Sequence, residues 1–206
     1  MKKILISIIL FLSGILCLNA QVKQIYSIHW DMSTPIGKYR TFTNEYSCRG
    51  FSVNAHIFPL KHLSIGIQIG WHSFHKNVAV STFRPSEGTA FTAATYNYVE
   101  DIPLAVGAYY HFLPDFPFAK PYIGLGIGAV YCNNEIQFQD LTLKDPTWGF
   151  ALIPEIGVFI PFGSSPVGLN VFAKYGVGFN NYAYRGESIQ PYQYLNIGIG
   201  LSFYVN

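Results

Sequence analysis

The chain has 206 residues, of which 13 are Lys or Arg and 11 are Asp or Glu, and its formal net charge at pH 7 is +2. Only 12% of its residues are charged, whereas about 25% is usual in a soluble domain. Without Lys2 and Lys3, which lie in a predicted leader, the charges balance, so no basic excess exists to bind nucleic acid. Beyond the leader, no apolar run approaches the ~20 residues of a membrane helix. This leaves a very apolar soluble β-domain or a membrane barrel.

Residues 1–20 predict a secretory signal peptide that is cleaved during export. Two lysines supply the positive start, residues 4–12 form an apolar core, and Ala20 is a small residue at the cleavage point. A retained membrane anchor is the alternative, although the apolar stretch is short for a spanning helix. The remainder, residues 22–206, is expected to form one barrel domain.

From residue 24 onward, segments of about ten residues alternate apolar side chains with small or polar ones. This period-2 pattern is typical of a strand with two unlike faces. Over residues 63–72, for example, the apolar side chains fall on one face and Ser, Gly, Gln and His fall on the other. We expect about eight strands, at residues 25–33, 48–58, 63–72, 96–112, 123–131, 147–162, 166–180 and 194–205.

The composition of the second face favours a membrane barrel over a soluble domain. A soluble sandwich would solvate this face with Lys, Glu and Thr, but here it carries Gly, Ser, Asn, Gln, His and Tyr with few charges. Such residues suit the crowded interior of a narrow barrel, and the continuous Ile, Leu and Val face then meets lipid. Closure also removes the free strand edge, which hydrocarbon cannot hydrogen-bond. The predicted fold class is therefore all-β, an eight-stranded antiparallel up-and-down transmembrane β-barrel.

The lengths of the connections predict an orientation in the membrane. In outer-membrane barrels the short turns face the periplasm and the long loops face outward, so both termini are expected in the periplasm. The short connections are residues 59–62, 113–119 and 163–166, and the long ones are residues 34–46, 75–94, 133–146 and 181–191.

A family resemblance is carried by three features: Ile102-Pro103-Leu104 at the opening of a long strand, the Gly-alternating run 120–128, and the C-terminal strand. The chain resembles the small outer-membrane β-barrel domain family of Gram-negative, porin-family proteins, whose members are OmpA-like, OmpX-like or OmpW-like. The resemblance covers residues 22–206 and implies insertion by the barrel-assembly machinery. The insertion signal of such barrels, polar-x-Gly-x-x-apolar-x-aromatic, is matched by Asn196, Gly198, Leu201 and Phe203. Three residues follow Phe203, where many members end on an aromatic residue.

Several polar side chains are predicted to face the lumen. Glu155 and Lys174 each lie nine residues from the turn at Ser164 and Ser165, so a symmetric hairpin places them directly opposite each other. A buried charge needs a partner, which makes the pair a structural ion pair or a polar gate. The same register points inward His29, Asp31, His56, His72, Tyr109 and His111.

No metal, cofactor or enzymatic site is predicted. The inward histidines are expected at different depths and share no spacing motif, which favours interior hydrogen bonding over metal binding. His62-Leu63-Ser64 has the spacing of the His-x-Ser pair of lipid A deacylases. Leu63 occupies the lipid face, however, so His62 and Ser64 are expected to point inward at the periplasmic end, which is the wrong place for that chemistry. Cys48 and Cys132 could pair or remain isolated thiols.

The sequence therefore predicts an integral outer-membrane protein with a side-chain-filled lumen and no enzymatic activity. Its leading role is structural, or that of a surface protein whose long loops bind an unidentified ligand. Two alternatives remain open: a narrow channel or carrier for a small apolar solute, and an outer-membrane enzyme that modifies lipids. The expected partners are outer-membrane lipids, the barrel-assembly machinery and the surface ligand, but not nucleic acid.

Overall fold

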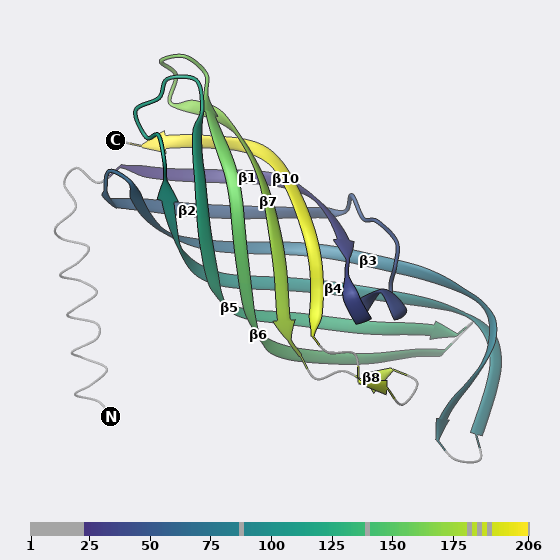
Figure 1. The fold of residues 1–206 in the computed structure, drawn as a ribbon. Coiled ribbons are helices and arrows are strands. Elements are labelled where there is room, and N and C mark those ends of the chain that lie inside the picture. The colour runs from purple at the N-terminus through teal and green to yellow at the C-terminus, as the bar shows by residue number, and fades with distance from the viewer. Residues whose placement is uncertain are drawn as a thin grey trace, which may run out of the picture.

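Eight long antiparallel strands close into a barrel in which the first strand pairs with the last (Figure 1). The predicted fold class and strand number are confirmed. The computed structural model describes residues 23–86, 89–138, 141–180, 183–184, 187–188 and 191–205, so the predicted signal peptide lies outside the described residues. The elements are β1 (Gln24–Pro35), η1 (Gly37–Thr41), β2 (Gly50–Leu60), β3 (Leu63–Ser86), β4 (Thr89–His111), β5 (Lys120–Phe138), β6 (Leu141–Pro161), β7 (Val167–Phe179), β8 (Ala183–Tyr184), β9 (Glu187–Ser188) and β10 (Tyr192–Val205).

The barrel wall is closed by the two terminal strands. β1 pairs with β10 along its whole length, but its pairing with β2 ends at Trp30↔Phe51. Past this point the wall is completed by the connection between β1 and β2, through the backbone bridge Ser33↔Ser47. Closure leaves no open sheet edge, which lipid could not satisfy with hydrogen bonds.

Along each strand, the side chains alternate between an exposed apolar face and a buried small or polar face. Ile67 of β3 is 56% exposed, whereas its neighbours Gly66 and Gln68 are buried. The same alternation separates the exposed Leu125 of β5 from the buried Gly126. The exposed apolar side chains form a belt around the barrel that suits contact with lipid.

Two of the four predicted long loops are instead mostly strand. β3 and β4 continue their ladder to Ser86↔Thr89, within the predicted loop 75–94, and β5 and β6 continue to Phe138↔Leu141, within the predicted loop 133–146. Beyond the lipid, neither face of a strand has to be apolar, so the sequence no longer alternates there. The hydrogen-bonded ladder nevertheless continues, because strand pairing does not require that alternation. Register shifts after Val78 and Phe83 indicate bulges, which bend strands, and the β3–β4 hairpin curves away from the barrel (Figure 1).

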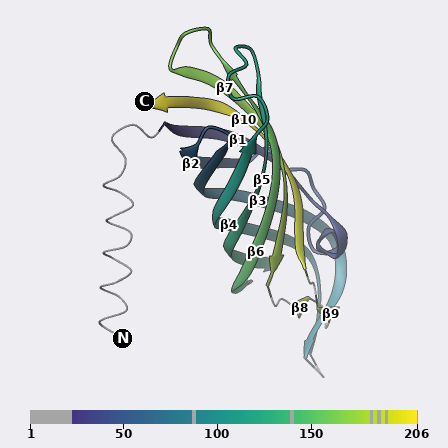
Figure 2. The same ribbon diagram turned by 60° about the vertical axis from the view of Figure 1, so that its left-hand side comes forward.

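The two ends of the barrel differ in the connections that they carry. The turn end carries the start of β1, the end of β10 and the three short connections, and the loop end carries the β3–β4, β5–β6 and β8–β9 hairpins (Figures 1 and 2). The predicted orientation, in which short turns face the periplasm, would place the turn end on the periplasmic side. Within the described ranges, no helix has the length and apolarity needed to cross a membrane.

Candidate functional site

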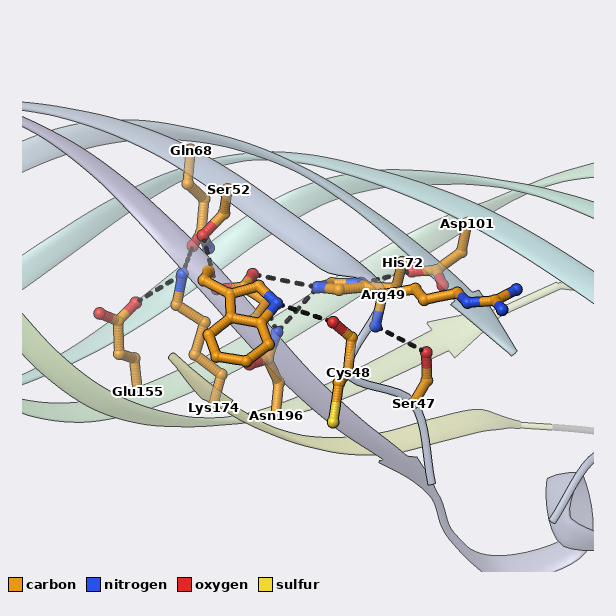
Figure 3. A network of polar contacts seen from close by, with 12 residues as sticks. Ser47, Cys48, Arg49, Ser52, Gln68, His72, Asp101, Glu155, Lys174 and Asn196 are labelled. Atoms are coloured by element: carbon orange, nitrogen blue, oxygen red, sulfur yellow. Dashed lines mark hydrogen bonds and ion pairs between the residues drawn. The ribbon is translucent and has the colours of Figure 1, made fainter. Parts of the chain in front are cut away.

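The middle of the lumen is filled by a hydrogen-bonded network around His72 (Figure 3). The two ring nitrogens of His72 face carboxylates on different strands: Nδ1 lies 3.0 Å from Asp101 Oδ2, and Nε2 lies 3.2 Å from Asp31 Oδ2. The amide nitrogen of Asn196 lies 2.7 Å from His72 Nε2 and 3.1 Å from Asp31 Oδ2. The Ser52 hydroxyl donates to Asp31 Oδ1 at 3.2 Å. These buried side chains link five consecutive strands of the barrel inside the lumen, β10, β1, β2, β3 and β4.

A second polar cluster contains Glu155 and Lys174 and lies nearer the turn end. The two residues are directly paired in the β6–β7 register, and Lys174 Nζ lies 3.6 Å from Glu155 Oε2. Lys174 also donates to Gln68 Oε1 at 3.0 Å and lies 4.0 Å from the centre of the Phe172 ring. The Tyr122 hydroxyl donates to Glu155 Oε1 at 2.8 Å. Both charges are therefore buried with polar partners, as a charge inside a barrel requires.

A cavity of about 10 Å³ separates the two clusters. It has room for about one water molecule. Its polar lining would give such a water several hydrogen-bond partners, so it is a bridging position and not a passage. The polar side chains that line it are Asp31, Ser52, Gln68, His72, Lys174, Tyr194 and Asn196.

The other predicted lumen histidines pack against aromatic rings. The ring of His29 lies edge-on to Phe172, with the ring centres 4.8 Å apart, and the ring of His56 lies edge-on to Tyr109 at 4.5 Å. All four residues are buried. Within the part of the chain that the structure describes, no three His, Cys, Asp or Glu side chains are grouped to hold a metal ion.

A serine and a histidine meet near the turn end, but without the accessibility that catalysis needs. The Ser64 hydroxyl lies 2.9 Å from His111 Nε2, and Ser64 is 0% exposed. His62, which the alternation predicts to point inward, is instead exposed, and its ring stacks on Tyr110 at 5.9 Å. The reason is that His62 belongs to the turn before β3, where the strand alternation has not yet begun.

Glycines beneath large rings allow the lumen to hold many aromatic side chains. The Tyr109 ring lies across Gly124 of the neighbouring strand, and the Phe172 ring lies across Gly198. A Cβ at either glycine would overlap the ring. Each ring thus occupies the space that a side chain on the glycine would take. This matters because the interior of an eight-stranded barrel is only about wide enough for its side chains.

The loop end of the lumen is closed by the connection between β1 and β2. This plug segment, residues 36–49, includes η1 and turns back over the mouth of the barrel (Figure 1). Tyr39 is 3% exposed and Phe42 is 0% exposed, and the Tyr39 ring meets the Tyr192 ring edge-on at 4.4 Å. Most of the predicted outer loop 34–46 therefore seals the lumen instead of projecting from it.

Hydrogen bonds hold the plug segment to the surrounding wall. The side-chain amide of Asn97 on β4 donates to the Phe42 carbonyl at 2.9 Å. The Thr43 hydroxyl donates to the His75 carbonyl on β3 at 3.1 Å. The Ile36 N–H donates to the Gln193 carbonyl of β10 at 2.9 Å. With the backbone bridge to β1 described above, the segment is tied to four strands. These bonds, together with the packing of the buried rings, keep its aromatic residues pointing into the lumen.

The two cysteines of the described chain are both free thiols. Cys132 on β5 is 2% exposed and belongs to the apolar cluster beneath the plug segment. Cys48 is exposed and lies in the plug segment itself, where its carbonyl accepts a hydrogen bond from the Trp30 indole at 2.7 Å.

The turn end is open where the loop end is closed. A vestibule of about 780 Å³ is lined by the three short connections and by residues at the ends of β1 and β10. His111 lies on its inner side.

Sequence reasoning missed Asp101 and the lumen role of Asn196. The alternation that predicts Tyr109 to face inward also places Asp101 on that face, because the two lie an even number of residues apart on one strand. The contact of Asp31 with His72 joins two strands that are not direct neighbours in the sheet. The two side chains meet over Gly50 of the intervening strand β2, where a Cβ would crowd both residues, so the pairing of neighbouring strands does not by itself reveal the contact.

A closed eight-stranded barrel with an apolar outer belt and a filled polar lumen defines a small integral outer-membrane β-barrel protein. No protein-family model and no curated protein matches the sequence. Among solved structures, OprG from Pseudomonas aeruginosa is similar with a TM-score of 0.52 and 10% identity over 90% of this chain and 96% of that chain. A major outer-membrane protein from Thermus thermophilus has a TM-score of 0.52 and 10% identity, over 89% and 99% of the two chains.

The attachment invasion locus protein Ail of Yersinia pestis, solved in complex with the heparin analogue sucrose octasulfate, has a TM-score of 0.51 and 9% identity. The match covers 89% of this chain and 99% of that chain. At such identities the likeness concerns the fold. It confirms the predicted resemblance to small outer-membrane barrels, and together with the apolar outer belt it agrees with the predicted location in the outer membrane. The barrels that this chain resembles are mainly non-enzymatic.

Proposed function

We propose that this protein is a non-conducting outer-membrane barrel that acts at the cell surface through its loop-end hairpins, and that it is not an enzyme. The observation that carries the proposal is the double closure of the lumen. The His72 network closes the middle, and the plug segment closes the loop end. Eight strands leave an interior only about wide enough for side chains, and here side chains occupy it in two successive layers.

The two longest hairpins support a role at the cell surface. β3 and β4 have 24 and 23 residues, and β5 and β6 have 19 and 21, whereas ~9–11 residues cross a membrane. Each hairpin therefore continues past the lipid as a hydrogen-bonded ladder. A ladder presents side chains and strand edges in a fixed geometry, which is an established way to bind a protein or peptide partner.

The two alternative functions find less support. An apolar solute on its way through the lumen would have to displace the buried charges of Asp31, Asp101, Glu155 and Lys174 from their partners, which is costly. A lipid-modifying enzyme would need a reactive group in contact with lipid. The Ser64 hydroxyl is enclosed within the barrel, and His62 is exposed in the turn with its ring stacked on Tyr110.

We propose outer-membrane lipids and the barrel-assembly machinery as further partners. Leu201 and Phe203 of the predicted insertion signal are 46% and 42% exposed on the outer face, where an assembly factor or lipid would contact them. Asn196 and Gly198 face the lumen. Asn196 joins the His72 network, and Gly198 lies beneath the Phe172 ring. These two positions therefore serve the folded barrel whether or not they also serve insertion.

Planar-bilayer recording of the refolded protein tests the closed lumen. We expect no steady single-channel current from the wild type. We also expect none after residues 37–45 are replaced by a short Gly-Ser linker, because the His72 network still closes the middle of the barrel. Steady single-channel currents from the wild type would refute the proposal and favour a channel.

A hairpin-shortening variant tests the surface role. Replacing residues 78–95 by Asn-Gly removes the outer part of the β3–β4 hairpin and leaves the pairs below it. We expect the variant to keep the heat-modifiable gel mobility of a folded barrel. Cells that display it should attach less to one another and to coated surfaces than cells that display the wild type. Equal attachment by the two would count against a surface role for this hairpin.

A further inference from the structure

The vestibule at the turn end has the size and walls of a small-molecule site. Its volume of about 780 Å³ lies within the range of ~300–1,000 Å³ that is typical of such sites. Proline is frequent in its lining, and because proline fixes φ, covalent geometry helps to set the shape of the walls. The prolines are Pro59, Pro114, Pro117, Pro161 and Pro166.

The vestibule is blind on its inner side. His111 is 7% exposed there, and its ring lies 4.8 Å from the Phe58 ring and 5.5 Å from the Tyr122 ring. Behind it, Ser64 and the hydrogen bond from Tyr122 to Glu155 fill the lumen. A molecule that enters from the periplasm can therefore bind in the vestibule, but it cannot pass onward through the barrel.

The charges that line the vestibule are mostly positive. Among the described residues, the lining includes Lys23, Lys61 and Lys120 and a single carboxylate, Asp115. Lys61 Nζ lies 2.5 Å from Asp115 Oδ2, and this hydrogen bond lowers the pKa of the Asp115 carboxyl, so the two charges offset each other at neutral pH. Lys120 Nζ lies 5.1 Å from the centre of the Tyr204 ring. Neither Lys23 nor Lys120 forms an ion pair within the described ranges.

We propose that the vestibule binds an amphiphile with a phosphate head. The head lies between Lys23 and Lys120, whose two charges match a phosphate monoester, for which lysine acts as a point-charge partner. The apolar part packs on Phe58 and Phe116. The vestibule opens at the periplasmic rim, so the phosphate can belong to a lipid headgroup of the inner leaflet or to a soluble phosphate ester.

Isothermal titration calorimetry of the refolded barrel in a neutral detergent tests the proposal and separates the two sources. Dihexanoyl phosphatidic acid is the lipid probe, and glycerol 3-phosphate is the soluble probe. Dihexanoyl phosphatidylcholine has the same chains without the net charge and controls for partition into detergent. The test variant is Lys23→Gln/Lys120→Gln. The matched control, Lys38→Gln/Lys144→Gln, removes two exposed charges at the loop end.

We expect at least one phosphate probe to bind the wild type and the control equally, and to bind Lys23→Gln/Lys120→Gln about tenfold or more weakly. Binding of phosphatidic acid alone supports the proposal with lipid as the source. Comparable binding of glycerol 3-phosphate supports it with a soluble ester as the source. Three results overturn it: no binding of either phosphate, equal binding by the test variant, or equal binding of phosphatidylcholine. Unchanged heat-modifiable mobility checks that each variant is folded.

Discussion

The two ends of the barrel carry aromatic residues in their connections but use them in opposite ways. At the loop end, Tyr39 and Phe42 are buried in the mouth. At the turn end, Phe116 and Phe118 are 46% and 73% exposed, and the mouth is open. The difference lies in the hydrogen bonds. The plug segment bonds to the strands of the wall, whereas the N–H of Phe116 donates within its own connection, to Leu113. Apolarity alone does not make a connection into a seal.

The largest loss of stability is expected from a substitution in the His72 network, which lies between the two ends of the barrel. His72→Ala removes the side chain that contacts both Asp31 and Asp101, and loss of one partner of a buried charged pair costs about 3–5 kcal/mol. The free energy of unfolding, measured by urea titration in lipid vesicles, should fall by this amount. The matched control is His75→Ala. His75 pairs with Glu45 at the loop end, where both side chains are partly exposed, so loss of this pair should lower the free energy of unfolding by less than about 1 kcal/mol. Equal costs for the two variants would contradict the network's role.

The next largest loss of stability is expected in the plug segment, and the same substitution at the turn end gives a direct comparison. Phe42→Ala removes a fully buried ring from the plug segment and should cost about 3 kcal/mol. Phe116→Ala removes a half-exposed ring from the turn end and should cost less than about 0.5 kcal/mol. The same urea titration measures both, and similar costs at the two ends would contradict the comparison.

Thiol labelling gives a second measurement of the same comparison. A maleimide should label exposed Cys48 rapidly in the wild type and buried Cys132 slowly. Phe42→Ala should increase the Cys132 rate roughly tenfold by favouring local opening of the plug segment, and Phe116→Ala should not. An unchanged Cys132 rate in Phe42→Ala would show that the plug segment is not what protects this thiol.

The smallest effect is expected at the exposed ion pair of the turn end. Lys61→Ala should leave the urea midpoint unchanged, because exposed ion pairs contribute little. It should, however, raise the pKa of Asp115, since the Lys61 hydrogen bond lowers that pKa below its ordinary value of 3.8. In the wild type the small contribution of the pair is present above the ordinary pKa and is lost as the pH falls through the lowered one. A carboxyl NMR titration measures the shift, and an unchanged Asp115 titration in the variant would argue against the contact.

The sequence was sufficient for the parts of the fold that lie in lipid. There, each strand must present one apolar face, so period-2 alternation marks both the strand and the direction of its side chains. The symmetric spacing of Glu155 and Lys174 about their turn corresponds to the observed β6–β7 register. Strands near Ser86 and Phe138 were predicted as loops because the alternation ends where the lipid ends, although the hydrogen-bonded ladder does not.

Two features depend on contacts that local patterns do not encode. Tyr39 and Phe42 stand in a short polar stretch without periodicity, and only the bonds to Asn97 and His75 show that this stretch turns inward. Asp31 approaches His72 over Gly50 of the strand between them, because this glycine has no side chain to separate the two. Alternation identifies which side chains enter the lumen, but not which of them meet there.

The β3–β4 hairpin has a mechanical consequence. His72 and Asp101 are opposite each other in its register, at the base of the part that leaves the barrel. From His72 to Ser86, roughly 14 residues at ~3.3 Å each make an arm of about 45 Å before bending. A pull applied at the tip passes along the continuous backbones of β3 and β4 into the barrel wall. At the base of the arm, the contacts of His72 with Asp31 and Asn196 add a side-chain link from β3 to β1 and β10. If the hairpin binds a partner at the cell surface as proposed, the His72 network also braces the base of the arm against that pull.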